Sequence, residues 1–392
     1  MACGAPTGAA LTGAAPAGAV SGVRVASGVT YTHFDIQAGR GVTRAHVLTV
    51  DLRNVRVRVD LLYPGAVAAR APISRLADAR GAVAGVNGDF FNISEAQHPG
   101  VAATGAPVGP LIAGGRPLKA AVPDGQRFGP ALPPGTSTRD VLGLGVDRRF
   151  RLDSVRLEGT VNTDGGKLRL GGLNQYALSV GSIGAYTSKW GGVSRVRATC
   201  GTDTDRAAPC SSDTYEVTVR KGRVVKVSAR PGSGPIAADT TVLVGREAGA
   251  RQLRKLSRGE SVKVRHRLVA ARSRIAYRFA VGGFPLLRGG RALAGLDDRT
   301  SAVRTAAGFA DRGRRLYLLA LDGAAQYRSG LTIAEVAATM RGLGVTDAFG
   351  LDGGGSSTLV ARNPGAHAVS VRNHPSEGSE RAVANGIGVF SR

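Results

Sequence analysis

The sequence VTDAFGLDGGGSST, residues 345–358, places an apolar stretch directly before an acidic, glycine-rich loop. Val345 to Leu351 predicts a buried strand, and Asp352 follows it with a carboxylate that could act as acid, base, nucleophile or metal ligand. Glycines let the main chain approach a ligand and turn its N–H groups toward an anion, and hydroxyl groups add donors. The alternative is a tight structural turn capped by Asp352. The remaining loop residues are Gly353, Gly354, Gly355, Ser356, Ser357 and Thr358.

A second loop of the same kind lies near the N-terminus. Ala82 to Val86 predicts a short apolar strand, and it runs into Asn87-Gly88-Asp89-Phe90-Phe91. Asn87 and Asp89 could hold sugar hydroxyls, whereas we expect the two phenylalanines to pack in the core. Both loops therefore place a carboxylate at the end of a strand.

Periodicity predicts several further elements around these loops. Alternation over Val55 to Leu61 predicts a half-buried strand, and Ala71 to Arg80 predicts a short helix. Leu316 to Leu321 predicts a buried strand that ends at Asp322. The helix that follows should begin with a capping box made by Thr332 and Glu335. Glu380 to Val389 should end the chain as a strand.

The middle of the chain has a different pattern. Residues 120–150 are rich in proline and glycine and predict a long loop or subdomain boundary, and residues 151–280 predict short strands and hairpins. The clearest hairpin turns at Lys221-Gly222. We therefore expect an α+β protein with mixed multistranded sheets and few helices. Its core should be split between residues 30–125 and 280–392, with 130–280 as a β-rich middle section or insert.

Two similar segments suggest a pair of related hairpins. Residues 110–118, PLIAGGRPL, resemble residues 285–293, PLLRGGRAL. Each predicts two short strands that turn at a Gly-Gly pair. The alternative is that such pairs recur by chance in a glycine-rich chain.

The N-terminus and the cysteines bear on location. Residues 1–28 predict a flexible tether, because they are small and unpatterned and lack the basic and apolar regions of a signal peptide. If the true start lies upstream, Cys3 could be a lipid-anchored cysteine. Cys200 and Cys210 bracket a polar loop and could form a disulfide, which fits a secreted or envelope protein, or remain two thiols.

The charge balance favours anionic partners. Lys and Arg exceed Asp and Glu by 52 − 28 = +24, and the densest basic stretch runs from Arg246 to Arg278. A cell-wall polymer or other anionic glycan would suit this charge, although codon bias could produce a merely solvated surface. Aromatic residues are only 5%, which makes nucleic acid an unlikely partner.

No apolar run in the sequence approaches the roughly 18 residues that a membrane span needs. The sequence does not determine the oligomeric state.

Several segments together resemble the phosphodiester glycosidase family, which includes the N-acetylglucosamine-1-phosphodiester alpha-N-acetylglucosaminidase ("uncovering") enzymes. The most specific are the 351–358 loop and the closing segment 380–387. The segments that carry the resemblance, spread over roughly residues 80–390, are Gly85 to Phe91, Gly282 to Leu287, Arg304 to Gly308, Leu351 to Thr358, and Glu380 to Ile387.

The resemblance implies hydrolysis of a sugar bound through its anomeric carbon to phosphate. It implies a catalytic role for Asp352, Asp89 and Arg304. The residues implied in substrate binding are Asn87, Gly88, Thr305, Gly353, Gly354, Gly355, Ser356, Ser357, Thr358 and Arg381. No cofactor is certain.

Two other functions stay open. Asp89, Asp322 and Asp352 could gather Mg²⁺ or Ca²⁺ in a metal-dependent phosphodiesterase that cuts the P–O bond. A basic envelope protein could instead bind anionic glycan without turnover. The six histidines show no metal-ligand spacing, and His374 is notable only because it lies near the other C-terminal residues.

Overall fold

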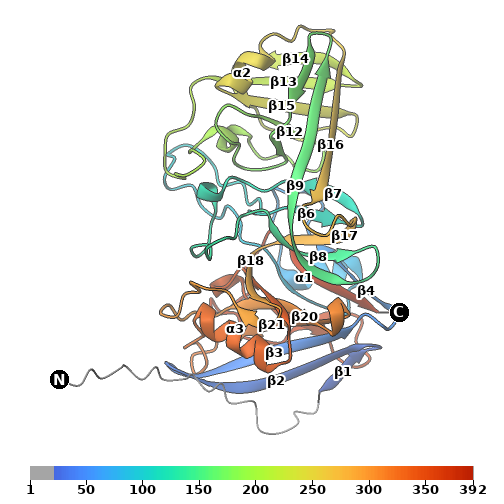
Figure 1. The fold of residues 1–392 in the computed structure, drawn as a ribbon, viewed down its shortest axis with the longest axis vertical. Helices are drawn as coiled ribbons and strands as arrows, with labels where there is room; N and C mark the ends of the chain where they lie inside the picture. The colour runs from blue at the N-terminus through green and yellow to red at the C-terminus, as the bar shows by residue number, and fades with distance from the viewer. Residues whose placement is uncertain (1–21, 392) are drawn as a thin grey trace, which may run out of the picture.

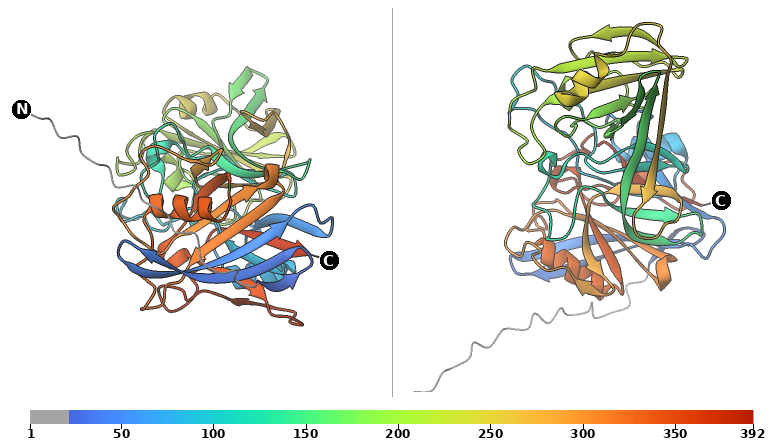
Figure 2. Two further views of the ribbon diagram at one scale, coloured as in Figure 1. Left: turned by 60° about the horizontal axis from the view of Figure 1, so that its bottom comes forward. Right: turned by 45° about the horizontal axis from the view of Figure 1, so that its top comes forward.

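Strands from both ends of the sequence lie side by side in the lower lobe of the molecule (Figure 1). The computed structural model describes residues 22–391. Strands from the middle of the sequence form an upper lobe, and two long strands run between the lobes. Both further views keep the same division between the lower and the upper lobe (Figure 2).

An eight-stranded sheet forms the base of the lower lobe. The run of apolar residues near 316–321 becomes a central strand of this sheet and is almost entirely buried, as the sequence predicts. On one side this strand pairs with the strand that begins at residue 41, and on the other side with the strand that begins at residue 305. In spatial order the strands are β1 (Val23–Ala26), β2 (Val29–Ala38), β3 (Gly41–Asp51), β21 (Arg315–Leu321), β20 (Thr305–Ala310), β22 (Asp347–Leu351), β18 (Phe284–Arg288) and β19 (Arg291–Ala292).

A five-stranded sheet carries the second loop. The strand predicted before Asn87 lies in its centre, and the closing strand of the chain lies beside it. Residues 380–385, which we expected to extend that closing strand, precede it instead. In spatial order the strands are β24 (Val369–Val371), β23 (Leu359–Arg362), β5 (Ala84–Asn87), β25 (Gly386–Ser391) and β4 (Val57–Leu62).

A third sheet leads from the lower lobe into the upper one. The expectation of a loop over residues 120–150 is wrong in part, because Asp140–Gly145 form a buried strand, β8, paired on both sides. The long strand β16 (Val262–Ala270) pairs along its whole length with another long strand, β9 (Phe150–Thr163). The other strands, in spatial order, are β10 (Gly166–Arg169), β9 (Phe150–Thr163), β8, β17 (Tyr277–Gly282), β6 (Leu111–Ala113) and β7 (Arg116–Lys119).

The fourth sheet belongs to the upper lobe. Its hairpin turns at Lys221 and Gly222, which both have positive φ, as the sequence predicts for a tight turn. In spatial order its strands are β11 (Gly172–Leu173), β12 (Ile183–Tyr186), β15 (Thr240–Arg246), β13 (Thr214–Arg220) and β14 (Arg223–Ser228).

The two Gly-Gly segments form the expected hairpins. Gly114 and Gly115 join β6 to β7, and Gly289 and Gly290 join β18 to β19. All four glycines have positive φ, a conformation that a side chain would disfavour. The two hairpins belong to different sheets.

Three α-helices occur in the described part of the chain: α1 (Ile73–Arg80), α2 (Ala248–Leu253) and α3 (Ile333–Gly342). The capping box of α3 is confirmed, because the Glu335 amide donates to Thr332 Oγ1 at 3.1 Å and the Thr332 amide donates to Glu335 Oε2 at 2.8 Å. No helix among residues 22–391 is long and apolar enough to span a membrane.

The fold is therefore β-rich with few helices, in keeping with a mostly-β α+β class. The described strand pairs are antiparallel except for β11 with β12, so the sheets are less mixed than expected. The expected tether over residues 1–28 is wrong at its end, because Val23–Ala26 pair with β2 as β1. Residues 1–21, including Cys3, lie outside the described residues.

Candidate active site

Asn87 joins the three loops that the sequence singled out. It ends β5 and is fully buried. Its Nδ2 donates to the main-chain oxygen of Asp352 at 2.7 Å. Its Oδ1 accepts from the Thr305 hydroxyl at 2.9 Å and from the Thr358 amide at 3.1 Å. Because these contacts occupy its acceptor, Asn87 is a positioning residue in this structure rather than an open sugar ligand.

Main-chain hydrogen bonds also join the two acidic loops directly. The Asp352 amide donates to the Gly88 carbonyl at 2.9 Å, and the Gly88 amide donates to the Asn385 carbonyl at 2.9 Å. Asn385 Oδ1 accepts from the Asp89 amide at 3.0 Å. A Cβ at Gly88 would overlap Asn385 Oδ1, so only glycine fits there. Ends of β5, β22 and β25 thus meet at one place.

The glycines of the 351–358 loop serve close packing. A Cβ at Gly353 would come within 2.7 Å of the Val303 carbonyl, and one at Gly355 would overlap Arg381. The loop folds into a short 3₁₀ helix, η4 (Gly354–Ser356). Its shape therefore depends on Gly353 and Gly355, which pack against neighbouring chain segments, and on Gly354, which has positive φ and open space around it.

The same loop does not offer the expected ring of open N–H groups. The amides of Gly354, Ser356 and Ser357 donate to carbonyls inside the protein, and the Gly353 amide donates to Asp352 Oδ1. The Thr358 amide donates to Asn87, as described above. Anion recognition by the main chain, which the glycine pattern suggested, is therefore largely replaced by internal bonding.

The hydroxyl groups of the loop are mostly bonded as well. Ser357 Oγ lies 3.0 Å from the Thr305 hydroxyl, which also contacts Asn87. Ser356 is hydrogen-bonded to Asp352 and accepts from Arg381 Nη1 at 3.3 Å. Thr358 Oγ1 is buried and has no partner among the described residues.

Asp352 is partly exposed, as are Gly353 and Gly354, whereas Leu351 and residues 355–358 are buried. The surrounding protein removes water from its carboxyl group and raises its pKa to about 7. The negative charge of Asp89 acts in the same direction, whereas hydrogen bonds from Ser356 and Gly353 and the charge of Arg381 lower the pKa. A carboxyl group with this pKa can exchange a proton near neutral pH.

Asp89 is almost fully buried beside Asp352. Its Oδ2 accepts from the Gly109 amide at 2.6 Å, and its Oδ1 has no partner among residues 22–391. Burial raises the pKa of Asp89, and the nearby Lys119 and Arg127 lower it. The two carboxylates are close enough for the charge of Asp89 to affect the pKa of Asp352.

Lys119 supplies the counter-charge for Asp89. It is fully buried, and its Nζ donates to the carbonyls of Val108, Gly109 and Ala120 at 2.8, 3.0 and 2.6 Å. Burial lowers the pKa of Lys119, and Asp89 raises it. Three carbonyl acceptors match the three hydrogens of an ammonium group, so the geometry favours a charged Lys119 and an ionised Asp89.

The two arginines that the sequence singled out, Arg381 and Arg304, have different surroundings in the structure. Arg381 lies against Gly355 and is ion-paired with Glu377, so its charge reaches the Asp352 loop. The Arg304 guanidinium instead donates to the carbonyls of Thr300 at 2.7 Å and Leu331 at 3.3 Å. These contacts hold the chain around the two carbonyls, and a catalytic role for Arg304 stays a prediction.

Asp322 does not join the two other carboxylates. Its oxygens accept from the Ala324 amide at 2.8 Å and lie 2.9 Å from His46 Nε2 and 3.0 Å from His374 Nδ1. Within residues 22–391, the one group of three close metal-binding side chains is His98, Cys200 and Cys210. Both cysteines of that group are bonded in a disulfide, as the sequence allowed.

Three residues near the carboxylates were missed as site residues by sequence reasoning: Lys119, Arg127 and Asn385. Only Asn385 carried a signal, since it lies in the closing segment that resembles the family.

Two cavities, of about 150 Å³ beside Asp60 and about 430 Å³ beside Glu216, do not include the carboxylates of Asp89 and Asp352.

A comparison with protein families gives a match over part of the chain. A family model described as phosphodiester glycosidase matches residues 213–390, which include Asp352 and Arg381 but not Asp89. No curated protein sequence matches significantly.

Solved structures show a similar fold. A hypothetical protein from Synechocystis has a TM-score of 0.72 and 20% identity over 96% of this chain, which spans only 64% of that protein. A candidate exported protein from Burkholderia pseudomallei K96243 has a TM-score of 0.67 and 24% identity, with 90% of this chain and 76% of that chain covered. The zebrafish N-acetylglucosamine-1-phosphodiester alpha-N-acetylglucosaminidase catalytic domain, auto-inhibited by its pro-peptide, has a TM-score of 0.42 and 16% identity, covering 93% and 84%.

Proposed function

Because residues 213–390 match a family model described as phosphodiester glycosidase, we propose that this chain hydrolyses a sugar-1-phosphodiester at the anomeric C–O bond. The observation that carries the proposal is the joining of Asp89 and Asp352 through Gly88 and Asn87. Two carboxylates in one site are the usual requirement of glycoside hydrolysis.

Asp352 acts in this proposal as the reacting carboxylate, directly on the anomeric carbon or through a water molecule. Its pKa of about 7 suits a group that must accept a proton near neutral pH. The departing phosphate monoester is already a weak base, so strong acid assistance is not needed. The site must mainly stabilise the oxocarbenium-like transition state and the phosphate.

Asp89 provides the negative charge that stabilises the sugar cation in the transition state. Its Oδ1 has no partner among the described residues, and Lys119 keeps it ionised. Arg381 provides positive charge beside the loop and suits the anionic side of the substrate.

The test is hydrolysis of a panel of sugar-1-phosphate diesters, including N-acetylglucosamine-1-phosphodiesters, in ¹⁸O-labelled water. The proposal expects the label in the released sugar, because the C–O bond breaks. Label in the phosphate would show P–O cleavage and favour a metal-dependent phosphodiesterase holding Mg²⁺ or Ca²⁺ at the acidic residues. No turnover of any member would leave binding as the function.

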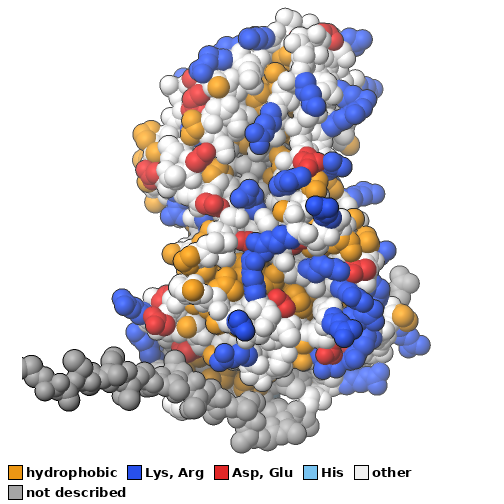
Figure 3. Space-filling model, in the orientation of Figure 1, with side chains coloured by type: hydrophobic (Ala, Val, Ile, Leu, Met, Phe, Trp, Pro, Cys, Tyr) orange, Lys and Arg blue, Asp and Glu red, His pale blue; other side chains and the backbone are white. Residues whose placement is uncertain are grey.

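The binding alternative has its own support on the upper lobe. The register of β10, β9 and β16 places basic residues on one face, since Arg169 and Arg265 both pair with Thr160, and Lys167 and Lys263 both pair with Asn162. Arg156 and Arg267 lie further along that face, where Glu158 pairs with both. Figure 3 shows basic side chains over this part of the molecule.

This basic face fits an anionic polymer such as a cell-wall glycan, either as the substrate or as an anchor. Binding to purified anionic wall polymer should weaken as salt rises, and K263Q/R265Q should weaken it further. Equal binding by this variant would reject the face as the attachment surface. The absence of stacking aromatics on its exposed side argues against nucleic acid.

We further propose that the protein is secreted or lies in the cell envelope. The disulfide between Cys200 and Cys210 supports an oxidising compartment, and one similar structure belongs to a candidate exported protein. Fractionation of cells that naturally produce the protein tests this, since the proposal expects the protein outside the cytoplasm. Labelling with a lipid precursor tests an anchor at Cys3.

A further inference from the structure

Arg127 lies beside the two carboxylates, although the resemblance did not include it. Its guanidinium stacks over Phe90 at 4.7 Å and Phe284 at 5.4 Å. Phe90 directly follows Asp89 in the chain, and a Cβ at Gly282, two residues before Phe284, would overlap Asp89 Oδ2. The two rings therefore fix the guanidinium at the acidic end of the site.

One donor of this guanidinium is unused. Arg127 Nη1 donates to the Pro130 carbonyl, whereas Nη2 is buried and has no partner within residues 22–391. Asp89 Oδ1 is buried and without a partner in the same way. The charges of both Asp89 and Asp352 act on Arg127. A buried charged donor without an acceptor costs free energy, which is recovered when a ligand supplies the acceptor.

A loop of the upper lobe holds the segment that carries Arg127. Arg206 Nη1 donates to the Arg127 carbonyl at 3.0 Å, and the Arg206 guanidinium stacks over Phe128 at 4.1 Å. Gln126 Nε2 donates to the carbonyls of Thr202 at 2.6 Å and Asp205 at 3.1 Å. Residues 202–206 lie inside the loop that the disulfide between Cys200 and Cys210 closes.

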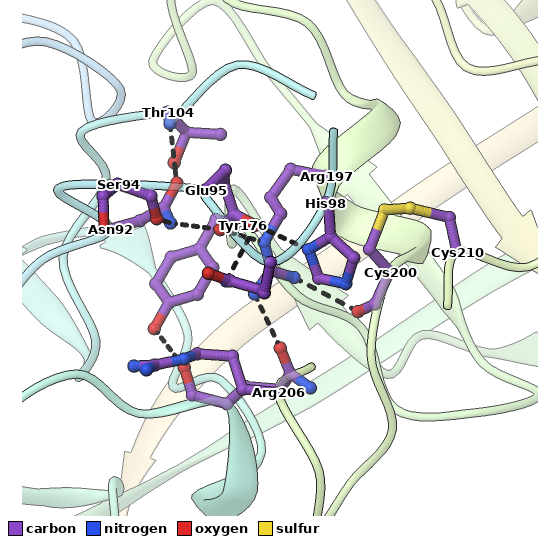
Figure 4. A network of polar contacts seen from close by, with 12 residues as sticks. Asn92, Ser94, Glu95, His98, Thr104, Tyr176, Arg197, Cys200, Arg206 and Cys210 are labelled. Carbon is purple, nitrogen blue, oxygen red and sulfur yellow. Dashed lines mark hydrogen bonds and ion pairs between the residues drawn. A yellow bond between two sulfur atoms is a disulfide. The ribbon is translucent and has the colours of Figure 1, made fainter. Parts of the chain in front are cut away.

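A buried polar network lies beside the same loop and contacts it (Figure 4). Arg197 forms a fully buried ion pair with Glu95 and donates from Nη2 to Gln126 Oε1 at 2.8 Å. His98 Nδ1 lies 2.6 Å from Glu95 Oε2, and its Nε2 lies 2.9 Å from the Ala208 carbonyl. The network thus connects the disulfide loop with the residue preceding Arg127.

We propose that Arg127 is the anion-binding donor of this site, and that the disulfide-closed loop 200–210 of the upper lobe positions it. This inference rests on the proposed function for the identity of the anion, a phosphate oxygen of the substrate. Nη2 donates to a non-bridging oxygen, and the positive charge stabilises the departing phosphate. Arg381 contacts the same substrate from the Ser356 side.

The loop acts through position rather than through contact with substrate. A disulfide limits the conformations of the segment from Cys200 to Cys210, and the contacts of this segment with Gln126 and Arg127 then limit those of the arginine. Reduction frees the loop, so that the guanidinium can turn out of the site. Anion binding should consequently depend on the redox state of Cys200 and Cys210.

The first test measures binding of inorganic phosphate to the full chain by calorimetry, which needs no turnover. Arg127→Gln should weaken phosphate binding about 10- to 100-fold, the loss expected for a charge-assisted hydrogen bond. Arg127→Lys should recover part of it, because the charge remains. Arg75→Gln, an exposed arginine on α1, is the matched control and should bind as the wild type does.

Phosphate affinity of Arg127→Gln equal to that of the wild type would overturn the proposal, provided that circular dichroism shows a folded chain. If Arg127→Gln does not fold, Arg127→Lys decides, and unchanged affinity together with an unchanged pH dependence would reject a fixed guanidinium. Loss of phosphate binding in Arg127→Gln without any hydrolysis by the wild type would retain the anion site and reject the proposed reaction.

The second test addresses the loop. The double variant C200S/C210S should bind phosphate several-fold more weakly than the wild type, and so should Arg206→Gln, which keeps the disulfide but loses the contact with Arg127. Wild-type affinity in both variants would reject the positioning role. Wild-type affinity in Arg206→Gln alone would assign the effect to the Gln126 contacts, which Gln126→Ala then tests with the same readout.

Discussion

Asn87 Nδ2 donates to the main-chain oxygen of Asp352 at 2.7 Å, across 265 positions of the sequence. This bond, together with the acceptor contacts of Asn87 Oδ1, holds the Asp352 loop against the Asn87–Phe91 loop. It joins the ends of two strands, β22 and β5, that belong to different sheets.

Replacement of Asn87 should therefore damage both stability and activity. Asn87→Ala removes three buried hydrogen bonds and leaves their partners unsatisfied, so we expect the free energy of unfolding to fall by about 3 kcal/mol. Urea unfolding measures this change. Thr305→Val removes only one of the three contacts and should cost roughly 1 kcal/mol. A smaller loss in Asn87→Ala than in Thr305→Val would contradict the central role of Asn87.

Asp352→Asn should lower turnover by orders of magnitude while the protein stays folded. The amide has nearly the same shape but cannot attack or accept a proton. Turnover of a sugar-1-phosphodiester is the measurement, with circular dichroism as the check on folding. Near-normal activity would reject Asp352 as the reacting carboxylate.

The pH dependence of activity should follow Asp352. Because it acts in its ionised form and its pKa is raised to about 7, kcat/KM should rise with pH through about 7. A rate that instead falls across that range would show that the protonated form is the active one.

The Asp352 carboxyl group should also make the free energy of unfolding depend on pH, but stability should fall where activity rises. A carboxyl group whose pKa is raised by folding binds more protons in the folded state, so its contribution declines as pH rises from about 4 to about 7. Asp352→Asn removes this slope. The stability of the variant relative to the wild type should therefore increase across that window, as measured by urea unfolding at several pH values.

Glu377 should restrain Arg381. The two side chains form an ion pair, and Arg381 also donates to Ser356 in the loop. Arg381→Gln should raise KM for a phosphodiester about tenfold, whereas Glu377→Gln should lower KM or leave it unchanged, because it releases the guanidinium. An equal rise of KM in both variants would show that the pair, rather than the arginine alone, is required.

Removal of metal ions should have little effect. Lys119 and Arg127 already place two positive charges beside Asp89, so a divalent ion would meet electrostatic repulsion. We expect turnover after dialysis against EDTA to stay within about twofold of the untreated protein. A large loss that Mg²⁺ or Ca²⁺ restores would support the metal-dependent phosphodiesterase.

Local patterns predicted much of the fold. The buried run near 316–321, the capping box of Thr332 and Glu335, and the Gly-Gly hairpins all depend on neighbours within a few residues. Strand β8 was missed because its six residues, Asp140–Gly145, include two glycines and follow a proline-rich stretch, which together resemble a loop.

The site was predicted only in part. The acidic loops could be found because glycine, asparagine and carboxylate residues follow apolar strands in a recognisable order. The role of their glycines could not, since the loop amides bond to Val303 and other residues far away in sequence. Arg304 appeared suitable by type, but its guanidinium binds the Thr300 and Leu331 carbonyls.

The sequence by itself determined which strands end in carboxylates, where the chain turns, and that residues 213–390 match a family model described as phosphodiester glycosidase. Only the tertiary structure decided that Asp89 is balanced by Lys119, and that Arg127 lies beside it under a loop of the other lobe. The reason is physical: a turn or a helix cap is made by adjacent residues, whereas burial, charge pairing and unused donors depend on distances that arise when remote strands pack.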